Sequence, residues 1–550
     1  MDKLWLSHYQ EGVPYEINLN QYGSLIQMFE ESCSMYANKK AYTNFDVSIT
    51  YEELEDYSRL FALYLQRLGL KKGDRVAIML PNLLQYPIAL FGILRAGCIV
   101  VNTNPLYTRD EVVHQLSDCQ ASALIVLANF AKTVEAALPK LPHLKHVIVT
   151  EIGDVFPPLK RWLVNHVVKY IKRLVPPFSI PSAISFRDTI KPSRSKLIQE
   201  VITREDIAFI QYTGGTTGVA KGAILTHGNL LANVLQASAW ISPLQVNTED
   251  KIVTALPLYH IFSLTANCLT FLKFGAENIL ITNPRDLIQF IKTIRYRKIT
   301  AITGVNTLFN ALLHHPLFQD IDFSKLKLSL SGGMALQKSV ALAWREKTHS
   351  RVLEAYGLTE TSPAVTINPM YLEVYNGSIG LPLPSTEISI RDDNGFEVPL
   401  GETGELCIRG PQVMPGYWHR QDETDLVFWT DGFLRTGDIA RVDDQGFVYL
   451  VDRKKDMILV SGFNVYPNEV EQVISMLPGV LEVGVVGVHQ GDVDEKVKAC
   501  IVKRDESLTE TQVIAHCRKH LAAYKVPKII AFYSELPKTN VGKILRRELK

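Results

Sequence analysis

The sequence predicts an α/β protein that becomes mixed α+β towards its C-terminus. Short apolar runs rich in β-branched residues alternate with longer stretches of helical spacing, which is typical of parallel or mixed sheets covered by helices. The helical stretches include Tyr51–Leu68 and Asn229–Trp240. The predicted strands are Arg75–Met79, Ala123–Val126, His146–Val149, Ile207–Tyr212, Ile252–Ala255 and Thr300–Thr303.

Residues 385–450 have a different pattern, which predicts a β-rich region. Turn signals at 393–395 (Asp-Asn-Gly) and 444–446 (Asp-Gln-Gly) separate short strands and favour hairpins. The predicted strands are Glu387–Arg391, Glu405–Arg409 and Phe447–Val451.

Five consecutive charged residues, 452–456, follow the β-rich region, and a helix-like segment comes next at Pro467–Met476. A run of charges is usually a solvated face. With about 100 residues beyond it, this run also suits a linker between domains. We therefore divide the chain into a large domain (1–451), a hinge (452–456) and a small domain (457–550).

Composition excludes several classes of protein. The 550 residues are 47% hydrophobic and 21% charged, as in a globular protein with a sizeable core. Lys and Arg number 58 against 57 Asp and Glu, so no overall charge attracts nucleic acid. Seven cysteines without a CxxC pair argue against a disulfide framework or a zinc cluster and fit a reducing compartment.

The most apolar stretch is Leu83–Val101, and it contains Gln85, Pro87 and Arg95. A buried α/β element is therefore a better interpretation than a membrane span. We expect a cytoplasmic protein that can lie peripherally on the cytoplasmic face of a membrane.

A membrane contact is suggested by Leu159–Val175, which prolines bracket at 157–158 and 176–177. On a helix, most of its apolar residues fall on one half and most of its five basic residues on the other, with Lys160 and Trp162 as exceptions. Such a helix either lies on a membrane surface or packs on its own domain, and the sequence favours neither.

The segment Tyr212–Gly222 is the strongest chemical signal. It follows a strand-like run and contains Gly214, Gly215 and Gly218, Thr213, Thr216 and Thr217, and finally Lys221. Glycines let backbone N–H groups approach phosphates, while threonines and the lysine add donors and a cation. Because Gly222 follows Lys221, the segment is not the usual P-loop, which has Ser or Thr there. It predicts an ATP site.

Three further segments are weak alone but consistent with ATP chemistry. Tyr356–Thr361 offers an aromatic face for a purine and a carboxylate for Mg²⁺. Asp431–Asp438 places an aspartate that can accept both ribose hydroxyls. Pro537–Glu548 carries Lys543 after Gly542, where a loop could bring it between a carboxylate and an α-phosphate.

Together these segments resemble the adenylate-forming superfamily, which includes acyl-CoA synthetases, luciferases and peptide-synthetase adenylation domains. The resemblance covers essentially the whole chain and is greatest to bacterial long-chain fatty-acid–CoA ligases. Other segments that carry it are Pro257–Phe262, Ala301–Phe309, Asp431–Glu469 and the ending from Pro537.

The resemblance implies two α/β subdomains and a β-barrel-like piece in the large domain, with a small α+β domain hinged at Lys455. It also implies two steps: ATP and a fatty acid give acyl-AMP and pyrophosphate, then CoA gives acyl-CoA and AMP. Mg²⁺ accompanies ATP. The oligomeric state stays open between a monomer and a homodimer.

Residue roles follow from the resemblance, position by position. Thr216 and Glu360 resemble Mg²⁺ ligands, and the loop Thr213–Lys221 resembles a binder of the β- and γ-phosphates. Tyr356 would stack on adenine beside Glu354 and Ala355. Asp438 would hold the ribose, and Arg453 would support the nucleotide. Lys543 would act in adenylation. The acyl pocket would be lined by Tyr259, His260, Phe262, Gly304 and Gly333; the CoA channel would involve Ser461, Gly462 and Phe463.

Other functions share these motifs. A fatty acyl-AMP ligase that serves a carrier protein and a CoA ligase for a medium-chain or aromatic acid would have the same ATP segments. A non-enzymatic lipid- or nucleotide-binding protein is a third alternative, but the presence of Lys221, Glu360, Asp438 and Lys543 argues against it.

Overall fold

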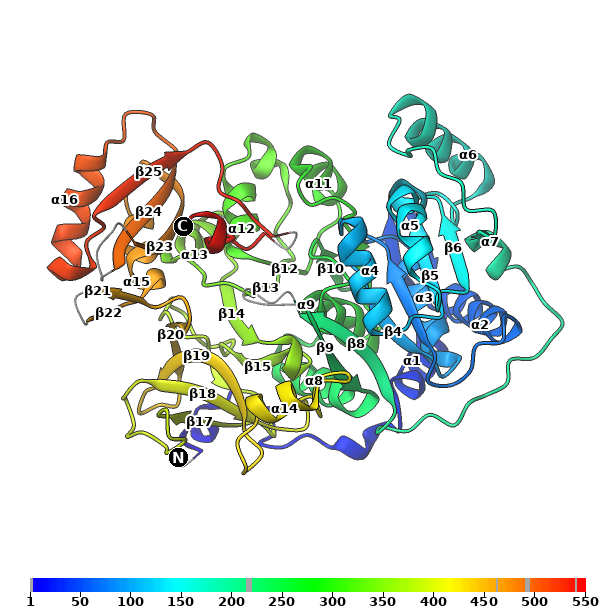
Figure 1. Ribbon diagram of the computed structural model, residues 1–550, viewed down its shortest axis with the longest axis horizontal. Helices are drawn as coiled ribbons and strands as arrows, with labels where there is room; N and C mark the ends of the chain where they lie inside the picture. The colour runs from blue at the N-terminus through cyan, green and yellow to red at the C-terminus, as the bar shows by residue number, and fades with distance from the viewer. Residues whose placement is uncertain (1–2, 214–219, 461–462, 490–494, 540–541) are drawn as a thin grey trace.

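The computed structural model describes residues 3–213, 220–460, 463–489, 495–539 and 542–550 (Figure 1). Two α/β layers form most of the molecule, a β-rich piece lies below them in the view, and the C-terminal elements lie at the upper left. The α/β prediction with a β-rich region and a small C-terminal α+β unit is confirmed.

One sheet has the strand order β7-β6-β5-β3-β4-β8-β9. Its strands are parallel except for the pair β8 and β9. Their bounds are β3 (Arg75–Met79), β4 (Ile99–Asn102), β5 (Ala123–Leu127), β6 (His146–Thr150), β7 (Ile184–Ser185), β8 (Ile207–Thr213) and β9 (Lys221–Thr226). The accompanying helices are α1 (Leu25–Met35), α2 (Tyr51–Arg67), α3 (Gln85–Arg95), α4 (Arg109–Asp118), α5 (Ala131–Ala137) and α7 (Phe186–Thr189).

The second sheet has the order β16-β15-β14-β13-β12-β10-β11-β1-β2, with a parallel centre from β14 to β1. Its strands are β1 (Lys40–Asn44), β2 (Val47–Thr50), β10 (Lys251–Thr254), β11 (Glu277–Leu280), β12 (Ala301–Gly304), β13 (Leu328–Gly332), β14 (Val352–Gly357), β15 (Ala364–Ile367) and β16 (Leu381–Pro382). Its helices are α8 (His227–Trp240), α9 (Ile261–Ser263), α10 (Phe271–Lys273), α11 (Leu287–Ile294), α12 (Asn306–Leu313) and α13 (Lys338–Thr348).

Local signals explain where the long helices start. At α2, the Thr50 side chain accepts from the Glu53 N–H while the Glu53 carboxylate accepts from the Thr50 N–H. Thr226 and Asn229 form the same reciprocal arrangement at α8. These caps satisfy donors that a helix start otherwise leaves unpaired.

The β-rich region is an antiparallel sheet in the order β17-β18-β19-β20. Its elements are β17 (Glu387–Arg391), β18 (Gly404–Arg409), α14 (Gln421–Val427), β19 (Leu434–Val442) and β20 (Val448–Arg453). The three strands expected from the turn signals are β17, β18 and β20, and the prediction missed β19. Glycine and polar residues at 436–438 interrupt the apolar pattern of β19.

The C-terminal elements follow the charged run. They are β21 (Ile458–Val460), β22 (Phe463–Val465), α15 (Pro467–Ser475), β23 (Val480–His489), β24 (Glu495–Lys503), α16 (Glu510–His520) and β25 (Ile529–Tyr533). Strands β23, β24 and β25 form one sheet, and α15 and α16 pack beside it around a separate apolar cluster.

The amphipathic segment forms α6 (Pro158–His166) and a π-helical turn, Val167–Ile171. The expected helix up to residue 175 is therefore wrong at its C-terminal end. Arg173 has left-handed backbone geometry (φ 51°), and the proline at 176 disfavours helical geometry at residue 175. In Figure 1, α6 projects at one corner of the molecule, beyond β6.

The apolar stretch 83–101 contains α3, whose residues are all buried, and β4, which lies inside the first sheet. The interpretation as a buried α/β element is confirmed. No helix in the described part of the chain is long and apolar enough to cross a bilayer.

Candidate active site

A cavity of about 1540 Å³ opens where the carboxyl ends of β12, β13 and β14 meet the C-terminal elements. Ligands of α/β sheets usually bind at such strand ends. The residues that line it include Lys221, Tyr259, His260, Phe262, Gly333, Glu354, Ala355, Tyr356, Glu360, Asp438, Arg453, Lys455 and Lys543. Most of the predicted site residues therefore come together from distant parts of the sequence.

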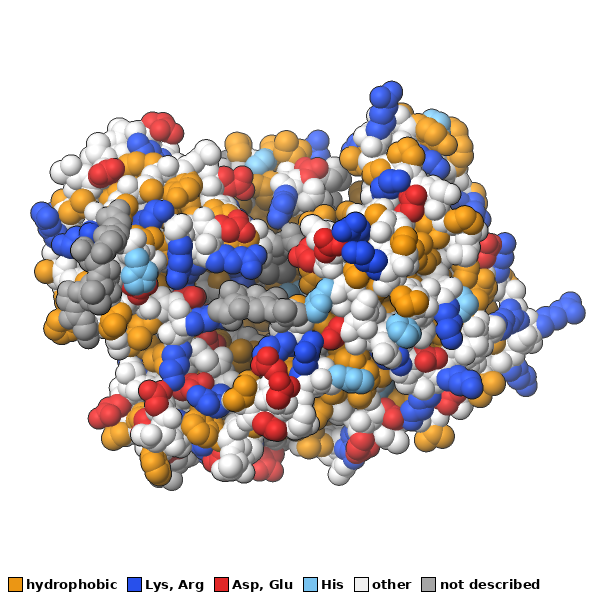
Figure 2. Space-filling view, in the orientation of Figure 1, with side chains coloured by type: hydrophobic (Ala, Val, Ile, Leu, Met, Phe, Trp, Pro, Cys, Tyr) orange, Lys and Arg blue, Asp and Glu red, His pale blue; other side chains and the backbone are white. Residues whose placement is uncertain are grey.

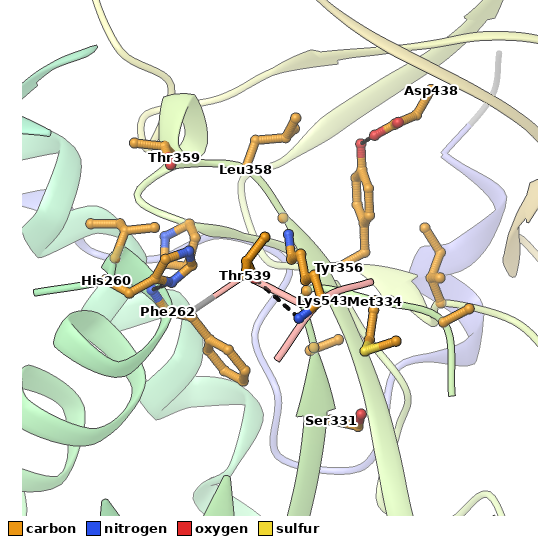
Figure 3. Close-up of a pocket in the computed structure, with 18 of the residues that line it drawn as sticks. His260, Phe262, Ser331, Met334, Tyr356, Leu358, Thr359, Asp438, Thr539 and Lys543 are labelled. Atoms are coloured by element: carbon orange, nitrogen blue, oxygen red, sulfur yellow. Dashed lines mark hydrogen bonds between the residues drawn. The ribbon is translucent and has the colours of Figure 1, made fainter. Parts of the chain in front are cut away.

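Lys543 reaches the cavity from the C-terminal segment (Figure 3). Its backbone N–H donates to the Thr539 hydroxyl at 3.1 Å, and its carbonyl accepts from the Thr539 N–H at 2.7 Å. The close-up places its side chain between the His260–Phe262 pair and the Tyr356 ring. The turn around Gly542, whose φ of 84° suits glycine, thus delivers a cation into the cleft.

Burial lowers the pKa of Lys543 to about 8; the positive Arg453 contributes, and Asp438 opposes the shift. Lys543 is charged below that pH and neutral above it. If the charged form is required, kcat/KM for ATP should fall about tenfold per pH unit above pH 8, since this ratio reports the free enzyme. ATP–pyrophosphate exchange, which omits CoA, measures this; a flat profile from pH 7 to 9.5 would contradict it.

Asp438, on β19, is buried and connects two other predicted nucleotide residues. Its carboxylate accepts a hydrogen bond from the Tyr356 hydroxyl at 2.6 Å and lies 3.3 Å from the Arg453 guanidinium. Burial raises the pKa of Asp438, although Arg453 and Tyr356 counteract this. The antiparallel pairing of Asp438 with Arg453 in β19 and β20 fixes this geometry.

Glu354 lies on β14, two residues before Tyr356. Burial raises the pKa of Glu354 well above its ordinary value. Its backbone carbonyl accepts from the Asn368 N–H at 2.9 Å, so the ladder already uses that group. Ala355 and Tyr356 follow it along the cavity wall.

Glu360 and Lys221 both contact Tyr417, a residue that the sequence motifs did not predict. The Tyr417 hydroxyl donates to Glu360 Oε1 at 2.7 Å. The Lys221 ammonium lies 5.2 Å from the centre of the Tyr417 ring and forms an ion pair with Glu423 at the start of α14. Lys221 and Glu360 are thus connected through one aromatic side chain.

His260 and Phe262 line the opposite wall with Tyr259. His260 Nδ1 accepts from the Phe262 N–H at 3.3 Å, so the neutral ring carries its proton on Nε2. Burial, with a contribution from Lys543, lowers the pKa of His260 to about 3. The imidazole is therefore uncharged at physiological pH.

The two glycines predicted for the acyl pocket differ in position. Gly333 lies against Lys543, because a Cβ there would be 3.3 Å from Lys543 Cε. Gly304 is not among the residues that line the cavity, and a Cβ on it would lie 2.9 Å from the Phe309 ring. Close packing on Phe309 accounts for glycine at 304.

The charged run is only partly solvated. Lys454 and Lys455 are exposed, but Asp452 is buried and lies 3.3 Å from the Arg546 guanidinium. Arg546 also pairs with Asp456 at 3.4 Å and with Glu471 at 3.0 Å. One arginine next to the Lys543 turn thus holds the charged run and α15 together.

Two hydrogen bonds join α12 to the C-terminal elements beside the cavity. The Thr307 hydroxyl donates to the Gly542 carbonyl, and the Asn310 amide donates to the Leu481 carbonyl, both at 3.0 Å. These bonds hold the Lys543 turn over the strand ends.

The CoA-binding prediction is only partly described. Phe463 is exposed and stacks on Tyr524 with ring centres 4.9 Å apart, and it does not line the cavity. Ser461 and Gly462 lie outside the described residues, as do Gly214, Gly215, Thr216, Thr217 and Gly218 of the loop. Thr213 is described at the end of β8, paired with Lys221.

Within the described ranges, no group of three or more His, Cys, Asp or Glu side chains is arranged to hold a metal ion. The seven cysteines are free and buried. The Glu360 carboxylate lines the cavity, and oxygen donors of this kind suit Mg²⁺.

Family models account for most of the chain. Residues 29–418 match the AMP-binding enzyme family, and residues 469–543 match the AMP-binding enzyme C-terminal domain. The gap between the two matches contains the charged run with Lys455.

Curated relatives match over the full length. A long-chain-fatty-acid–CoA ligase of Escherichia coli O6:H1 is 56% identical, covering 100% of this chain and 98% of its own. The ligases with the same name from Haemophilus influenzae and Bacillus subtilis (strain 168) are 50% and 38% identical over 100% of this chain, with 98% and 97% of their own lengths covered.

Solved structures agree with the fold. An anthranilate CoA ligase in complex with anthranoyl-AMP superposes with a TM-score of 0.84 at 28% identity, covering 97% of this chain and 98% of its own. A benzoate CoA ligase from Burkholderia xenovorans LB400 gives 0.82 at 27% identity, covering 96% and 99%. The chain therefore belongs to the family of AMP-binding, adenylate-forming enzymes.

Proposed function

We infer that this chain is an AMP-forming long-chain fatty-acid–CoA ligase. One observation carries this inference: Lys543, Asp438, Lys221 and Glu360 all line the same cavity. The identity of 50–56% to long-chain-fatty-acid–CoA ligases over the whole chain favours a long-chain acid as the substrate.

The first step joins two anions, so the protein must mainly neutralise charge and align the reactants. A carboxylate oxygen attacks the α-phosphorus of ATP, the α–β bond breaks, and pyrophosphate leaves. Lys543 would bridge the attacking carboxylate and the α-phosphate, while Lys221 and the loop 213–221 hold the β- and γ-phosphates. Asp438 would accept the ribose hydroxyls, with Arg453 supporting the nucleotide and Tyr356 stacking on adenine next to Glu354 and Ala355.

Glu360 suits a magnesium ligand. Its Oε1 accepts from Tyr417, while Oε2 has no hydrogen-bond partner among the described residues. A carboxylate oxygen of this kind in the cavity suits Mg²⁺, and Thr216 would be the second ligand. The ion would screen the triphosphate charge when it is bound.

The second step needs another arrangement of the small domain. CoA thiolate attacks the acyl carbonyl, and AMP leaves. Because Phe463 is exposed and does not line the cavity, rotation at Lys455 would be needed to withdraw Lys543 and bring residues 461–463 to a CoA channel. Domain boundaries at 452 and 456 suit this motion.

The acyl chain would pass Tyr259, His260 and Phe262 on the uncharged wall. Each CH₂ that it buries contributes about 0.8 kcal/mol, which favours long acids if the pocket is deep enough. Gly333 leaves room beside Lys543, where the carboxylate must sit.

A panel of acids from acetate to oleate, with and without CoA, tests this function. We expect AMP release to be fastest with long-chain acids and to require CoA for turnover. Turnover restricted to benzoate or to medium-chain acids would reject the long-chain assignment. Acyl-AMP that forms but is not consumed on adding CoA would indicate a ligase serving a carrier protein.

A second proposal concerns α6, which would dock on an anionic membrane surface. No residue between 157 and 179 is buried, and large apolar side chains there face solvent. They are Leu159, Trp162, Leu163, Tyr170, Ile171 and Leu174, which are 52–80% exposed. Figure 2 shows hydrophobic and basic side chains together at this corner. Val164 packs on the core, and Lys160 donates to the Phe45 carbonyl, which anchors the helix to its domain.

Lys169, Lys172 and Arg173 are exposed beside this apolar surface. Replacing all three by glutamine should weaken binding to phosphatidylglycerol vesicles by about 100-fold, at about 1 kcal/mol per basic residue. Activity on a short soluble acid should not change. Glutamine at three exposed basic positions elsewhere (Lys140, Arg518 and Lys519) is the control. Equal binding by both triple variants would reject the proposal.

A further inference from the structure

The side chain of Tyr417 contacts both charged groups on the pyrophosphate side of the cleft. Its hydroxyl donates to Glu360 Oε1 at 2.7 Å, and its ring lies 5.2 Å from the Lys221 ammonium.

The backbone around Tyr417 is bonded to the same two segments. Gly416 and Trp418 pair with β9, through bonds from the Ile224 N–H to the Gly416 carbonyl and from the Trp418 N–H to the Gly222 carbonyl, at 3.0 and 2.8 Å. The Met414 N–H donates to the Glu360 carbonyl at 2.8 Å. The tyrosine is therefore held in place relative to both partners, and its own N–H donates to Thr424 at 2.9 Å.

The position of Tyr417 matters because its two partners, Lys221 and Glu360, are charged. Lys221 and Glu360 have opposite charges, and a direct ion pair would cancel both of them. The Tyr417 side chain contacts both of them, and Lys221 forms its ion pair with Glu423. Glu360 therefore has one oxygen engaged by a neutral hydroxyl. Burial and the neighbouring Glu360 raise the pKa of Tyr417, so the hydroxyl stays protonated and can donate.

We propose that Tyr417 is a positioning residue, which keeps Glu360 oriented towards the metal side of the triphosphate and Lys221 oriented towards its phosphates. The proposal rests on the proposed function, because it takes Glu360 and Lys221 as ligands of magnesium and phosphate. It predicts that the two contacts of Tyr417 can be separated by substitution.

Tyr417→Phe removes the hydroxyl and keeps the ring. The substitution removes only the hydrogen bond to Glu360, the proposed Mg²⁺ ligand. The Kd for ATP, measured by calorimetry, should therefore rise about tenfold with Mg²⁺ present and stay unchanged in EDTA. Tyr417→Leu also removes the ring face from Lys221, so the Kd should rise under both conditions. Tyr9→Phe, which removes a hydroxyl bonded to the Pro382 carbonyl at 2.6 Å, is the control away from the cavity.

Melting temperatures separate positioning from folding, and we expect Tyr417→Phe and Tyr9→Phe to melt alike. Wild-type affinity of Tyr417→Phe in both conditions would overturn the inference, as would equal weakening with and without Mg²⁺. ATP–pyrophosphate exchange by the unaltered enzyme reports the proposed function separately. If exchange is absent while the Mg²⁺-specific shift appears, the function fails and the role of Tyr417 stands.

Discussion

Replacing Lys543 by alanine should lower the rate of acyl-AMP formation by about 100- to 1,000-fold, the usual effect of removing one preorganised donor from a site of developing charge. The reason is geometric, since Lys543 enters the cleft on a turn held by Thr539 and Thr307. ATP binding should weaken much less, because the loop and Asp438 remain.

The measurement is ATP–pyrophosphate exchange with palmitate, together with thioester formation from synthetic palmitoyl-AMP and CoA. The second reaction should be retained, because Lys543 acts before CoA arrives. Lys550→Ala, at another lysine that lines the cavity, is the matched control. Unchanged exchange by Lys543→Ala would contradict the role of Lys543 in adenylation, whereas no exchange by the unaltered chain would support the non-enzymatic alternative.

Replacing Arg546 by methionine should destabilise the small domain by about 3–5 kcal/mol, the range seen when one partner of a buried ion pair is removed. Arg546 is the cation shared by Asp452, Asp456 and Glu471. Burial already raises the pKa values of Asp452 and Glu471 while Arg546 counteracts it. Without the arginine, buried carboxylates would be left charged and unpaired.

Hydrogen exchange of the backbone amides of residues 457–550 as a function of urea concentration measures this loss. The deficit should be largest at neutral pH and shrink as pH falls through the raised pKa values, since protonation removes the buried charge. Arg547→Met, at the exposed neighbouring arginine, should have little effect. Equal stability of the two variants at pH 7 would contradict the account.

Much of the fold could be predicted because the pattern of apolar residues reflects burial directly. The strand at Arg75–Met79 and the helix starting at Tyr51 were predicted at the residues where they occur. Strand β19 was missed because Thr436, Gly437 and Asp438 interrupt the apolar alternation that marks a strand.

The site could be predicted only where short motifs carry it. Glu360 and Lys543 belong to such motifs, and the structure brings both to the cavity. Tyr417 and Arg546 do not, because their roles depend on partners 57 or more residues away. A lone tyrosine after glycine or an arginine in a basic tail gives no signal until the fold places its partners beside it.

In the proposed reaction, the fatty-acid carboxylate attacks the α-phosphorus of ATP. Palmitate labelled with ¹⁸O in its carboxylate tests this attack, with mass spectrometry of the nucleotide after one round of acyl-CoA formation. Attack at the α-phosphorus predicts that one ¹⁸O atom passes from palmitate into AMP, with unlabelled pyrophosphate released. ADP with ¹⁸O in inorganic phosphate would mean attack at the γ-phosphorus and would contradict the account.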